Sequence, residues 1–219
     1  MNTPTKLIGG LTVAAVLVVA RQIALNWGAK DDETECGLPG DLLVPDATVA
    51  TTRAITIDAP PAAVWPWVGQ LGWERGGFYS YDDIENALGM DIHNASSVSE
   101  GWQISQVGDE VHLTEDLAPL KVAMLEPERH LVLLGAPHNA RTDADVPAFE
   151  FSWAFVLQPL PATASGNTPR TRLIVRERYG AANLLARAEV EAIQPASFVM
   201  TQKMLRGIRD RAEGTNAAV

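Results

Sequence analysis

Large apolar residues alternate with smaller or polar residues between positions 149 and 157. The large ones are Phe149, Phe151, Trp153, Phe155 and Leu157. Successive side chains of a β-strand point to opposite faces, so all of these lie on one face if the segment is extended. A face this apolar has to be covered by another layer of the protein. The pattern therefore predicts a strand over Phe149–Leu157 that belongs to the core of a layered domain.

A covering layer is predicted near the C-terminus, where the sequence follows a helical period from Ile193 to Glu213. One side of this helix consists of Phe198, Thr201, Met204, Leu205, Ile208 and Ala212. The opposite side carries Lys203, Arg206, Arg209 and Asp210. Such a division is typical of a helix with one face on a core and the other in water. We expect a long amphipathic helix that packs on the sheet.

The segments between these points predict further strands and two short helices. Residues 51–58 alternate as a first strand, and Asp58 followed by prolines is a good N-cap for a helix that reaches Leu71. A second short helix is expected over Tyr81–Leu88. The other expected strands cover residues 102–107, 110–114, 120–125, 130–135 and 170–179. A run of antiparallel strands closed by one long helix predicts an α+β fold.

Three arginines of the last predicted strand share one face. Arg172, Arg176 and Arg178 alternate with the apolar Leu173 and Val175. A strand that covers a core turns its apolar residues inward. We therefore expect these arginines to point outward and to be solvated.

The N-terminal 27 residues are expected to form a separate segment. Residues 7–20 are apolar and uncharged, but a helix of that length rises only ~21 Å against a hydrocarbon core of ~30 Å. Apolar character resumes in the stretch 23–27. Three interpretations stay open: a single membrane anchor, a secretory signal peptide cleaved after Ala20, and a helix docked on the domain. Lys6 and Arg21 flank the run almost symmetrically, so charge does not predict an orientation in a membrane.

The rest of the chain divides into three parts. Residues 28–48 contain an acidic cluster and several Gly and Pro residues, which is typical of a linker. Residues 49–213 contain all the predicted strands and the long helix, and they form one domain. Residues 214–219 are expected to be a disordered tail.

Charge and cysteine content restrict the kinds of partner. The chain has a net charge of −10, which argues against nucleic acid because phosphate binding needs a basic face. Cys36 is the only cysteine, so no internal disulfide is expected. The histidines do not occur at metal-binding spacing, and no phosphate-binding loop motif is present. We expect no metal and no cofactor.

Three motifs carry a resemblance to a known superfamily. A strand runs into Ala-Pro-Pro-Ala-Ala-Val-Trp within Ala54–Trp65, the stretch 75–93 contains Arg-Gly-Gly-Phe-Tyr-Ser-Tyr-Asp, and Phe198–Ile208 lies in the closing helix. This arrangement resembles the START-like, polyketide cyclase-like (SRPBCC) superfamily, and within it an actinobacterial-type subgroup that often has an N-terminal apolar segment. The resemblance implies a helix-grip fold, in which a curved antiparallel sheet wraps around the C-terminal helix. It also implies a cavity between sheet and helix.

Residues expected to line such a cavity come from the aromatic segments and the closing helix. They are Tyr79, Tyr81, His93, Trp102, Phe151, Trp153, Phe155, Met200 and Met204. Aromatic and methionine side chains suit an adaptable apolar ligand, and the phenols or the imidazole can orient a polar group of it. As an alternative, the aromatic residues of the strand Phe149–Leu157 fill an ordinary core without a cavity. For His93 the alternative is a hydrogen bond to the backbone at a loop corner.

Three functions are compatible with these features. The first is binding or carriage of a small hydrophobic ligand, such as a lipid, an isoprenoid or a polyketide-like compound. The second is a cyclase or dehydratase that uses Tyr or His as acid or base. The third is a non-catalytic scaffold with a vestigial cavity. No nucleophile elbow or other catalytic motif is present, so no catalytic residue is predicted.

Overall fold

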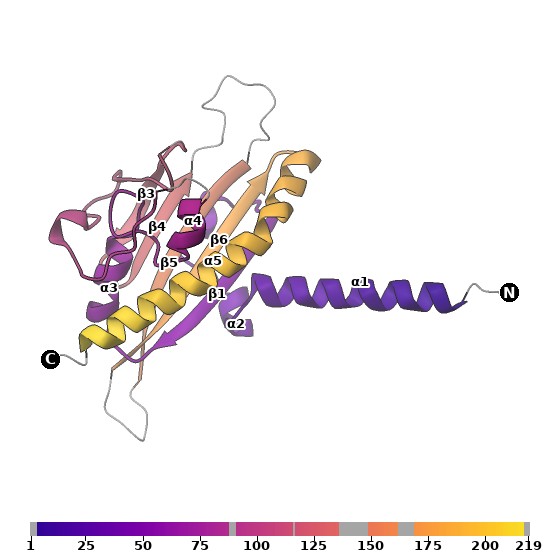
Figure 1. Ribbon diagram of the computed structural model, residues 1–219, viewed down its shortest axis with the longest axis horizontal. Helices are drawn as coiled ribbons and strands as arrows, with labels where there is room; N and C mark the ends of the chain where they lie inside the picture. The colour runs from indigo at the N-terminus through magenta and orange to yellow at the C-terminus, as the bar shows by residue number, and fades with distance from the viewer. Residues whose placement is uncertain (1–3, 88–90, 116, 136–148, 162–168, 217–219) are drawn as a thin grey trace.

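The computed structural model describes residues 4–87, 91–115, 117–135, 149–161 and 169–216. Six strands form one antiparallel sheet in the order β1-β6-β5-β4-β3-β2. Their bounds are β1 Val49–Ile57, β2 Glu110–Val111, β3 Leu120–Glu126, β4 His130–Gly135, β5 Phe149–Leu160 and β6 Arg170–Ala181. The C-terminal helix α5, Leu184–Asn216, lies across one face of the curved sheet (Figure 1). The fold is therefore α+β with the helix-grip architecture.

The other helices are short, apart from the first. They are α1 Pro4–Leu25, α2 Asp31–Glu35, α3 Pro61–Gly69 and α4 Asp82–Ala87, with 3-10 turns at η1 Asp41–Leu43 and η2 Glu100–Trp102. Helix α3 packs against α5, and its buried residues are Val64, Trp67, Val68 and Gly69. Helix α1 projects away from the sheet (Figure 1). Within the described ranges, no helix combines the length and the apolar character needed to cross a membrane.

The inner face of the sheet and the buried face of α5 form the main core. Alternate residues of β5 and β6 belong to it, among them Phe155, Leu157 and Leu173, together with Leu205 and Ile208 of the helix. A smaller cluster joins Leu25 at the end of α1 to Val49, Tyr179 and Val190. The end of α1 is therefore part of the folded domain.

Three predictions about local structure are wrong. The strand expected over residues 110–114 ends at Val111. Asp58 does not cap α3: the N-cap position is Pro60, without a side-chain hydrogen bond, and the Asp58 N–H donates to Glu213 Oε1 at 2.9 Å. Residues 103–107 are not a strand. The Asp109 carboxylate accepts from the backbone N–H groups of Ser105 (2.8 Å) and Gln106 (3.1 Å), and such local bonds compete with a sheet ladder.

The long helix extends beyond its predicted bounds at both ends. It begins at Leu184 and runs to Asn216, into the segment expected to be a disordered tail. Pro195 lies inside it. The residues 217–219 lie outside the described part of the chain.

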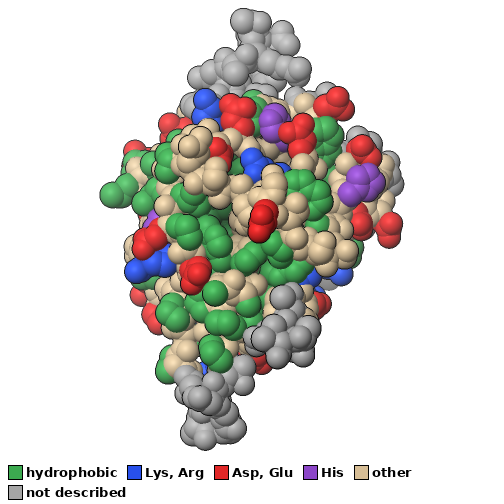
Figure 2. All heavy atoms as spheres, turned by 90° about the vertical axis from the view of Figure 1, so that its left-hand side faces the viewer, with side chains coloured by type: hydrophobic (Ala, Val, Ile, Leu, Met, Phe, Trp, Pro, Cys, Tyr) green, Lys and Arg blue, Asp and Glu red, His purple; other side chains and the backbone are tan. Residues whose placement is uncertain are grey.

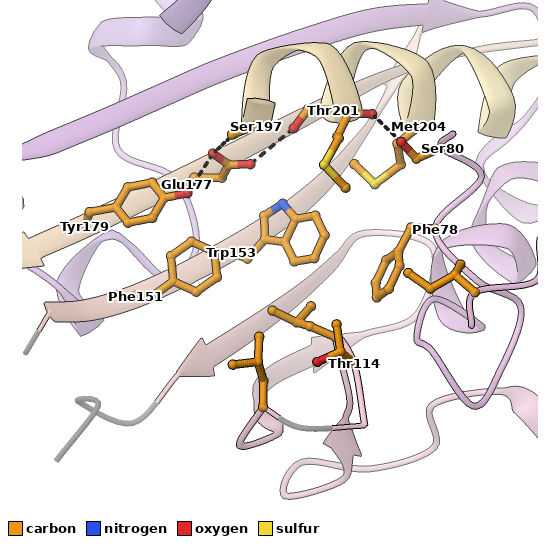
Figure 3. A pocket seen from close by; sticks show the side chains of 14 residues that line it. Phe78, Ser80, Thr114, Phe151, Trp153, Glu177, Tyr179, Ser197, Thr201 and Met204 are labelled. Atoms are coloured by element: carbon orange, nitrogen blue, oxygen red, sulfur yellow. Dashed lines mark hydrogen bonds between the residues drawn. The ribbon is translucent and has the colours of Figure 1, made fainter. Parts of the chain in front are cut away.

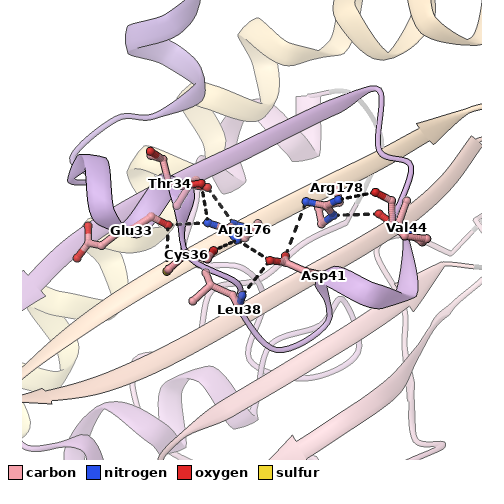
Figure 4. A network of polar contacts seen from close by, with 10 residues as sticks. Glu33, Thr34, Cys36, Leu38, Asp41, Val44, Arg176 and Arg178 are labelled. Carbon is pink, nitrogen blue, oxygen red and sulfur yellow. Dashed lines mark hydrogen bonds and ion pairs between the residues drawn. The ribbon is translucent and has the colours of Figure 1, made fainter.

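The expected linker is packed against the outer face of the sheet. Arg172 pairs with both oxygens of Glu33, at 2.7 Å each, and Arg176 Nη1 lies 2.7 Å from Asp41 Oδ2. Arg178 Nε donates to the Val44 carbonyl at 3.0 Å (Figure 4). Arg172 and Arg176 are buried. The arginines do point outward, but the prediction that they are solvated is wrong, because the segment 28–46 covers them.

The end of the molecule opposite α1 has a mixed surface. Hydrophobic side chains reach this face, and acidic side chains are scattered among them (Figure 2). The distribution agrees with the net charge of −10.

Candidate functional site

A cavity of about 260 Å³ lies between the sheet, α5 and the segments around Phe78 and Leu113 (Figure 3). Its apolar lining consists of Phe78, Ile92, Leu113, Leu117, Phe151, Trp153, Met200 and Met204. Its polar lining consists of Ser80, Thr114, Glu177, Tyr179, Ser197 and Thr201. The cavity occupies the space between β5, the residues Phe78, Ser80 and Ile92, and the inner face of α5.

Aromatic rings form the floor of the cavity. Trp153 stands between its strand neighbours, with ring centroids 6.4 Å from Phe151 and 4.8 Å from Phe155. Phe78 approaches the same indole from across the cavity, at 6.1 Å. The alternation of β5 directs Phe151, Trp153 and Phe155 to the inner face of the sheet, as the sequence predicts.

Glu177 is the charged residue at the polar end of this cavity. It lies on β6, and only 4% of it is exposed. Its Oε2 accepts from Ser197 Oγ (2.8 Å), Tyr179 OH (3.2 Å) and Thr51 Oγ1 (3.4 Å). Its Oε1 accepts from Thr201 Oγ1 at 3.2 Å. The carboxylate is thus held by hydroxyl groups from two strands and from α5.

Arg53 on β1 supplies the opposite charge. It is fully buried, and its Nη1 lies 3.3 Å from Glu177 Oε2. The same Nη1 donates to Ser197 Oγ (2.9 Å) and Thr201 Oγ1 (3.1 Å), while Nε donates to the Ala24 carbonyl at 3.0 Å. Burying a charge is tolerated when it is paired and hydrogen-bonded in this way. The pair therefore joins the sheet, α5 and the end of α1.

Tyr179 lies beside the carboxylate and is also buried. Burial raises the pKa of its phenol well above the usual range, and the negative charge of Glu177 raises it further. The Tyr179 hydroxyl therefore stays protonated at neutral pH and acts as a donor to Glu177.

Trp153 contributes a donor without a partner. Its indole Nε1 is buried and makes no hydrogen bond to any described residue. A buried donor left unpaired costs roughly 1–3 kcal/mol.

The structure brings four of the predicted site residues together. Phe151, Trp153, Met200 and Met204 line the cavity. The remaining five lie outside its lining.

Two of these five residues, Tyr79 and Phe155, are buried in the core. Phe155 is fully buried behind Trp153. Tyr79 turns away from the cavity while its neighbours Phe78 and Ser80 face it, and the Tyr79 hydroxyl donates to the Trp67 carbonyl at 3.1 Å.

The other three are at the surface. Tyr81 and Trp102 are partly exposed, and Trp102 borders a separate polar depression next to Arg75. His93 is exposed and lies outside the cavity lining. It pairs with the Asp91 carboxylate at 3.1 Å rather than with the backbone group of the alternative interpretation.

Sequence reasoning missed the polar end of the cavity. Glu177 lies on the same strand face as Leu173 and Val175. On another strand, Arg53 lies on the same face as Ile55 and Ile57. A charged residue in an otherwise apolar face, on each of two strands, was the available signal.

Comparison with known proteins adds a likeness of fold. No protein-family model matches the chain, and no curated protein matches it significantly. The hypothetical protein jhp0584 from Helicobacter pylori has a similar structure, with a TM-score of 0.51 and 15% identity over 80% of this chain and 95% of that chain.

Two further solved structures have lower scores. CalU16 from Micromonospora echinospora has a TM-score of 0.32 and 15% identity, over 77% of this chain and 86% of its own. Ms6760 from Mycobacterium smegmatis has a TM-score of 0.39 and 12% identity, over 78% and 93%. At such identities a likeness concerns the fold alone, so the function has to be argued from the site.

Proposed function

We propose that the domain binds a small, largely apolar molecule in the cavity between the sheet and α5. The observation that carries this proposal is the cavity itself, with its wall of aromatic, aliphatic and methionine side chains. Adaptable apolar walls with a few polar groups are typical of small-molecule sites. The START-like, polyketide cyclase-like resemblance of the sequence supports the same function by analogy.

The volume indicates the size of the molecule that the hollow itself can hold. An apolar cavity of about 150 Å³ holds benzene, and pockets for drug-sized ligands start near 300 Å³. A volume of about 260 Å³ therefore suits a molecule of one or two rings, or an isoprenoid of comparable size. Among the ligands expected from the sequence, this favours the smaller ones.

A cyclase or dehydratase reaction is the second candidate, because a carboxylate faces the cavity. The acid–base groups on offer are Glu177 and Tyr179, in place of the expected Tyr79 and His93. The raised pKa of Tyr179 makes it a weak acid at neutral pH, and Glu177 is already occupied by its donors. Binding without reaction is therefore the function that the site supports better.

A two-ring probe without hydrogen-bonding groups tests the proposal. Fluoronaphthalene is titrated against the full chain, and its binding is followed by fluorine NMR. Met200→Trp fills the cavity, and Val199→Trp places the same side chain at the neighbouring, exposed position of α5. We expect saturable binding to the native protein and to Val199→Trp, and at least about tenfold weaker binding to Met200→Trp.

Two results would overturn the proposal. One is the absence of saturable binding to the native protein. The other is equal binding to both tryptophan variants, provided that thermal unfolding shows that both are folded.

A further inference from the structure

We infer that the ligand is a pure hydrocarbon over the part that the cavity encloses, and that the cavity discriminates against hydroxylated relatives of that ligand. This inference rests on the proposed function and adds to it the chemical class of the ligand: a ring hydrocarbon or a branched alkene with no oxygen or nitrogen atom in its enclosed part.

The wall that a ligand can touch is almost wholly apolar, although several polar residues belong to the lining. A hydrogen bond requires a polar atom that the ligand can reach and that has capacity to spare. Trp153 shows the difference, because its ring belongs to the lining while its Nε1 is buried out of reach. The polar residues of the lining therefore have to be judged by their individual atoms.

The Glu177 carboxylate has no capacity left for a ligand. Its two oxygens accept hydrogen bonds from Arg53 Nη1 and from the hydroxyl groups of Thr51, Tyr179, Ser197 and Thr201. A carboxylate offers about four lone-pair sites, and five donors already share them here. A hydroxyl group of a ligand would have to displace one of these donors.

Three hydroxyl groups of the lining are occupied by the same network. Ser197 Oγ and Thr201 Oγ1 donate to Glu177, and both accept from Arg53 Nη1, at 2.9 and 3.1 Å. The Tyr179 hydroxyl donates its single proton to Glu177 at 3.2 Å. The network thus satisfies its members within the protein and offers no donor to a ligand.

The two remaining polar residues of the lining lie apart from this network. Ser80 is buried, and its Oγ donates to the Met200 carbonyl oxygen at 3.4 Å. Thr114 is half-buried and lies across the cavity from α5 (Figure 3). Leu117, which lines the same side, is 45% exposed. Water therefore reaches this side of the cavity, and one hydroxyl group of a ligand can stay hydrated there.

A hydroxyl group anywhere else in the cavity would lose its hydrogen bonds to water and gain none from the protein. Burial of a hydroxyl without a partner is unfavourable, whereas a hydrocarbon loses no hydrogen bond and gains dispersion contacts with the wall. We expect each enclosed hydroxyl group to weaken binding at least about tenfold.

Three naphthalenes of nearly equal size test the inference on the full chain. They are difluoronaphthalene, fluoronaphthol and naphthalenediol, each substituted at the two ends of the long axis of the ring system. Fluoronaphthol can turn its one hydroxyl toward the open side, whereas the diol has to enclose one of its two. We expect the diol to bind at least about tenfold more weakly than fluoronaphthol. Fluorine NMR measures the first two affinities directly, and displacement of difluoronaphthalene gives that of the diol.

A pair of variants tests whether missing hydrogen bonds cause the loss. Met200→Gln places an amide in the cavity wall on the α5 side, opposite Thr114, and should reduce the loss caused by the second hydroxyl several-fold. Val199→Gln makes the same substitution at the neighbouring, exposed position of α5 and should leave the loss unchanged. Binding of difluoronaphthalene to both variants shows that the cavity is intact.

The outcomes separate this inference from the proposed function. A diol that binds within about tenfold of fluoronaphthol would overturn the inference and leave the apolar cavity in place. An unchanged loss in Met200→Gln, with difluoronaphthalene still bound, would also overturn it. If difluoronaphthalene does not bind to the native protein, the proposed function fails, and the inference fails with it.

Discussion

Trp153 and Glu177 face each other across β5 and β6, and both side chains enter the cavity beneath α5. This cross-strand pair places a carboxylate beside an indole whose Nε1 is buried and has no partner among the described residues. Arg53, from the next strand, neutralises the carboxylate from the core side. The inner face of the sheet therefore carries an aromatic cluster on β5 next to a buried ion pair between β6 and β1.

The first prediction concerns the buried ion pair. Arg53→Met removes the charge that compensates Glu177 and leaves a carboxylate in the core. Breaking a buried pair in this way costs roughly 3–5 kcal/mol, so we expect a loss of that size in the free energy of unfolding, measured by chemical denaturation. Adding Glu177→Gln to Arg53→Met is expected to recover part of the loss. A single variant within about 1 kcal/mol of the native protein would show that the pair is not important for stability.

The second prediction concerns the contact between α5 and the backbone of Tyr79. A Cβ at Gly207 would lie 2.6 Å from the Tyr79 carbonyl oxygen and 2.8 Å from its Cβ. Gly207→Ala is therefore expected to destabilise the protein by roughly 1–3 kcal/mol, as overpacking does. Gly214→Ala in the same helix has open space around its Cβ, and it should be neutral or stabilising by up to about 1 kcal/mol. Equal effects of the two substitutions in thermal unfolding would contradict this packing.

The third prediction concerns the attachment of residues 28–46 to the sheet at low pH. Burial opposes the ionisation of Glu33, but hydrogen bonds from Arg172 and from the Lys30 backbone N–H outweigh it and hold its pKa below the usual value. A carboxyl with a lowered folded-state pKa contributes stability above its unfolded pKa of about 4.3 and loses it as the pH falls through the lower folded value.

We therefore expect the segment to become sensitive to an acid-active protease as the pH falls below about 4. Glu33→Gln should be sensitive already at neutral pH, and its sensitivity should change less with pH. Glu35→Gln, an exposed glutamate in the same helix α2, is the control and should behave like the native protein. Identical acid profiles for all three proteins would contradict the role of Glu33.

The fourth prediction concerns Tyr79 at high pH. Burial raises the pKa of Tyr79 to about 12, although the positive charge of Arg211 lowers it in part. A group with a raised folded-state pKa contributes stability that is complete below its unfolded value of about 10 and is lost as the pH rises through the folded value. Ultraviolet titration should show a phenol that ionises only as the protein unfolds in alkali. In Tyr79→Phe that step should be smaller, and an unchanged step would refute the assignment.

Much of the secondary structure is predictable because it depends on local periodicity. β4 has the predicted bounds, and β5 and β6 extend the predicted strands at their C-terminal ends. The expected strand over 102–107 is wrong because the Asp109 side chain makes local hydrogen bonds that alternation does not reveal. The helix α5 begins at Leu184, before the predicted start at Ile193, because the apolar stripe used for the prediction does not reach these first residues.

The candidate site was predictable only in its apolar part. Phe151, Trp153, Met200 and Met204 follow from period two in the strand and from the stripe on the helix. Tyr79, by contrast, was expected in the cavity, but its side chain turns into the core while Phe78 and Ser80 take that position. Attachment of residues 1–27 to a membrane, or their removal as a signal peptide, stays a prediction.

By itself the sequence determined which residues share a face, since that depends on backbone period alone: Glu177 stands with Leu173 and Val175, and Arg53 stands with Ile55. Only the tertiary structure decided what these faces meet. The antiparallel register sets Glu177 opposite Trp153, and the packing of α5 brings Ser197 and Thr201 to the same carboxylate. Periodicity contains no information about partners more than a hundred residues away on another strand, whereas sheet pairing fixes them within a few ångströms.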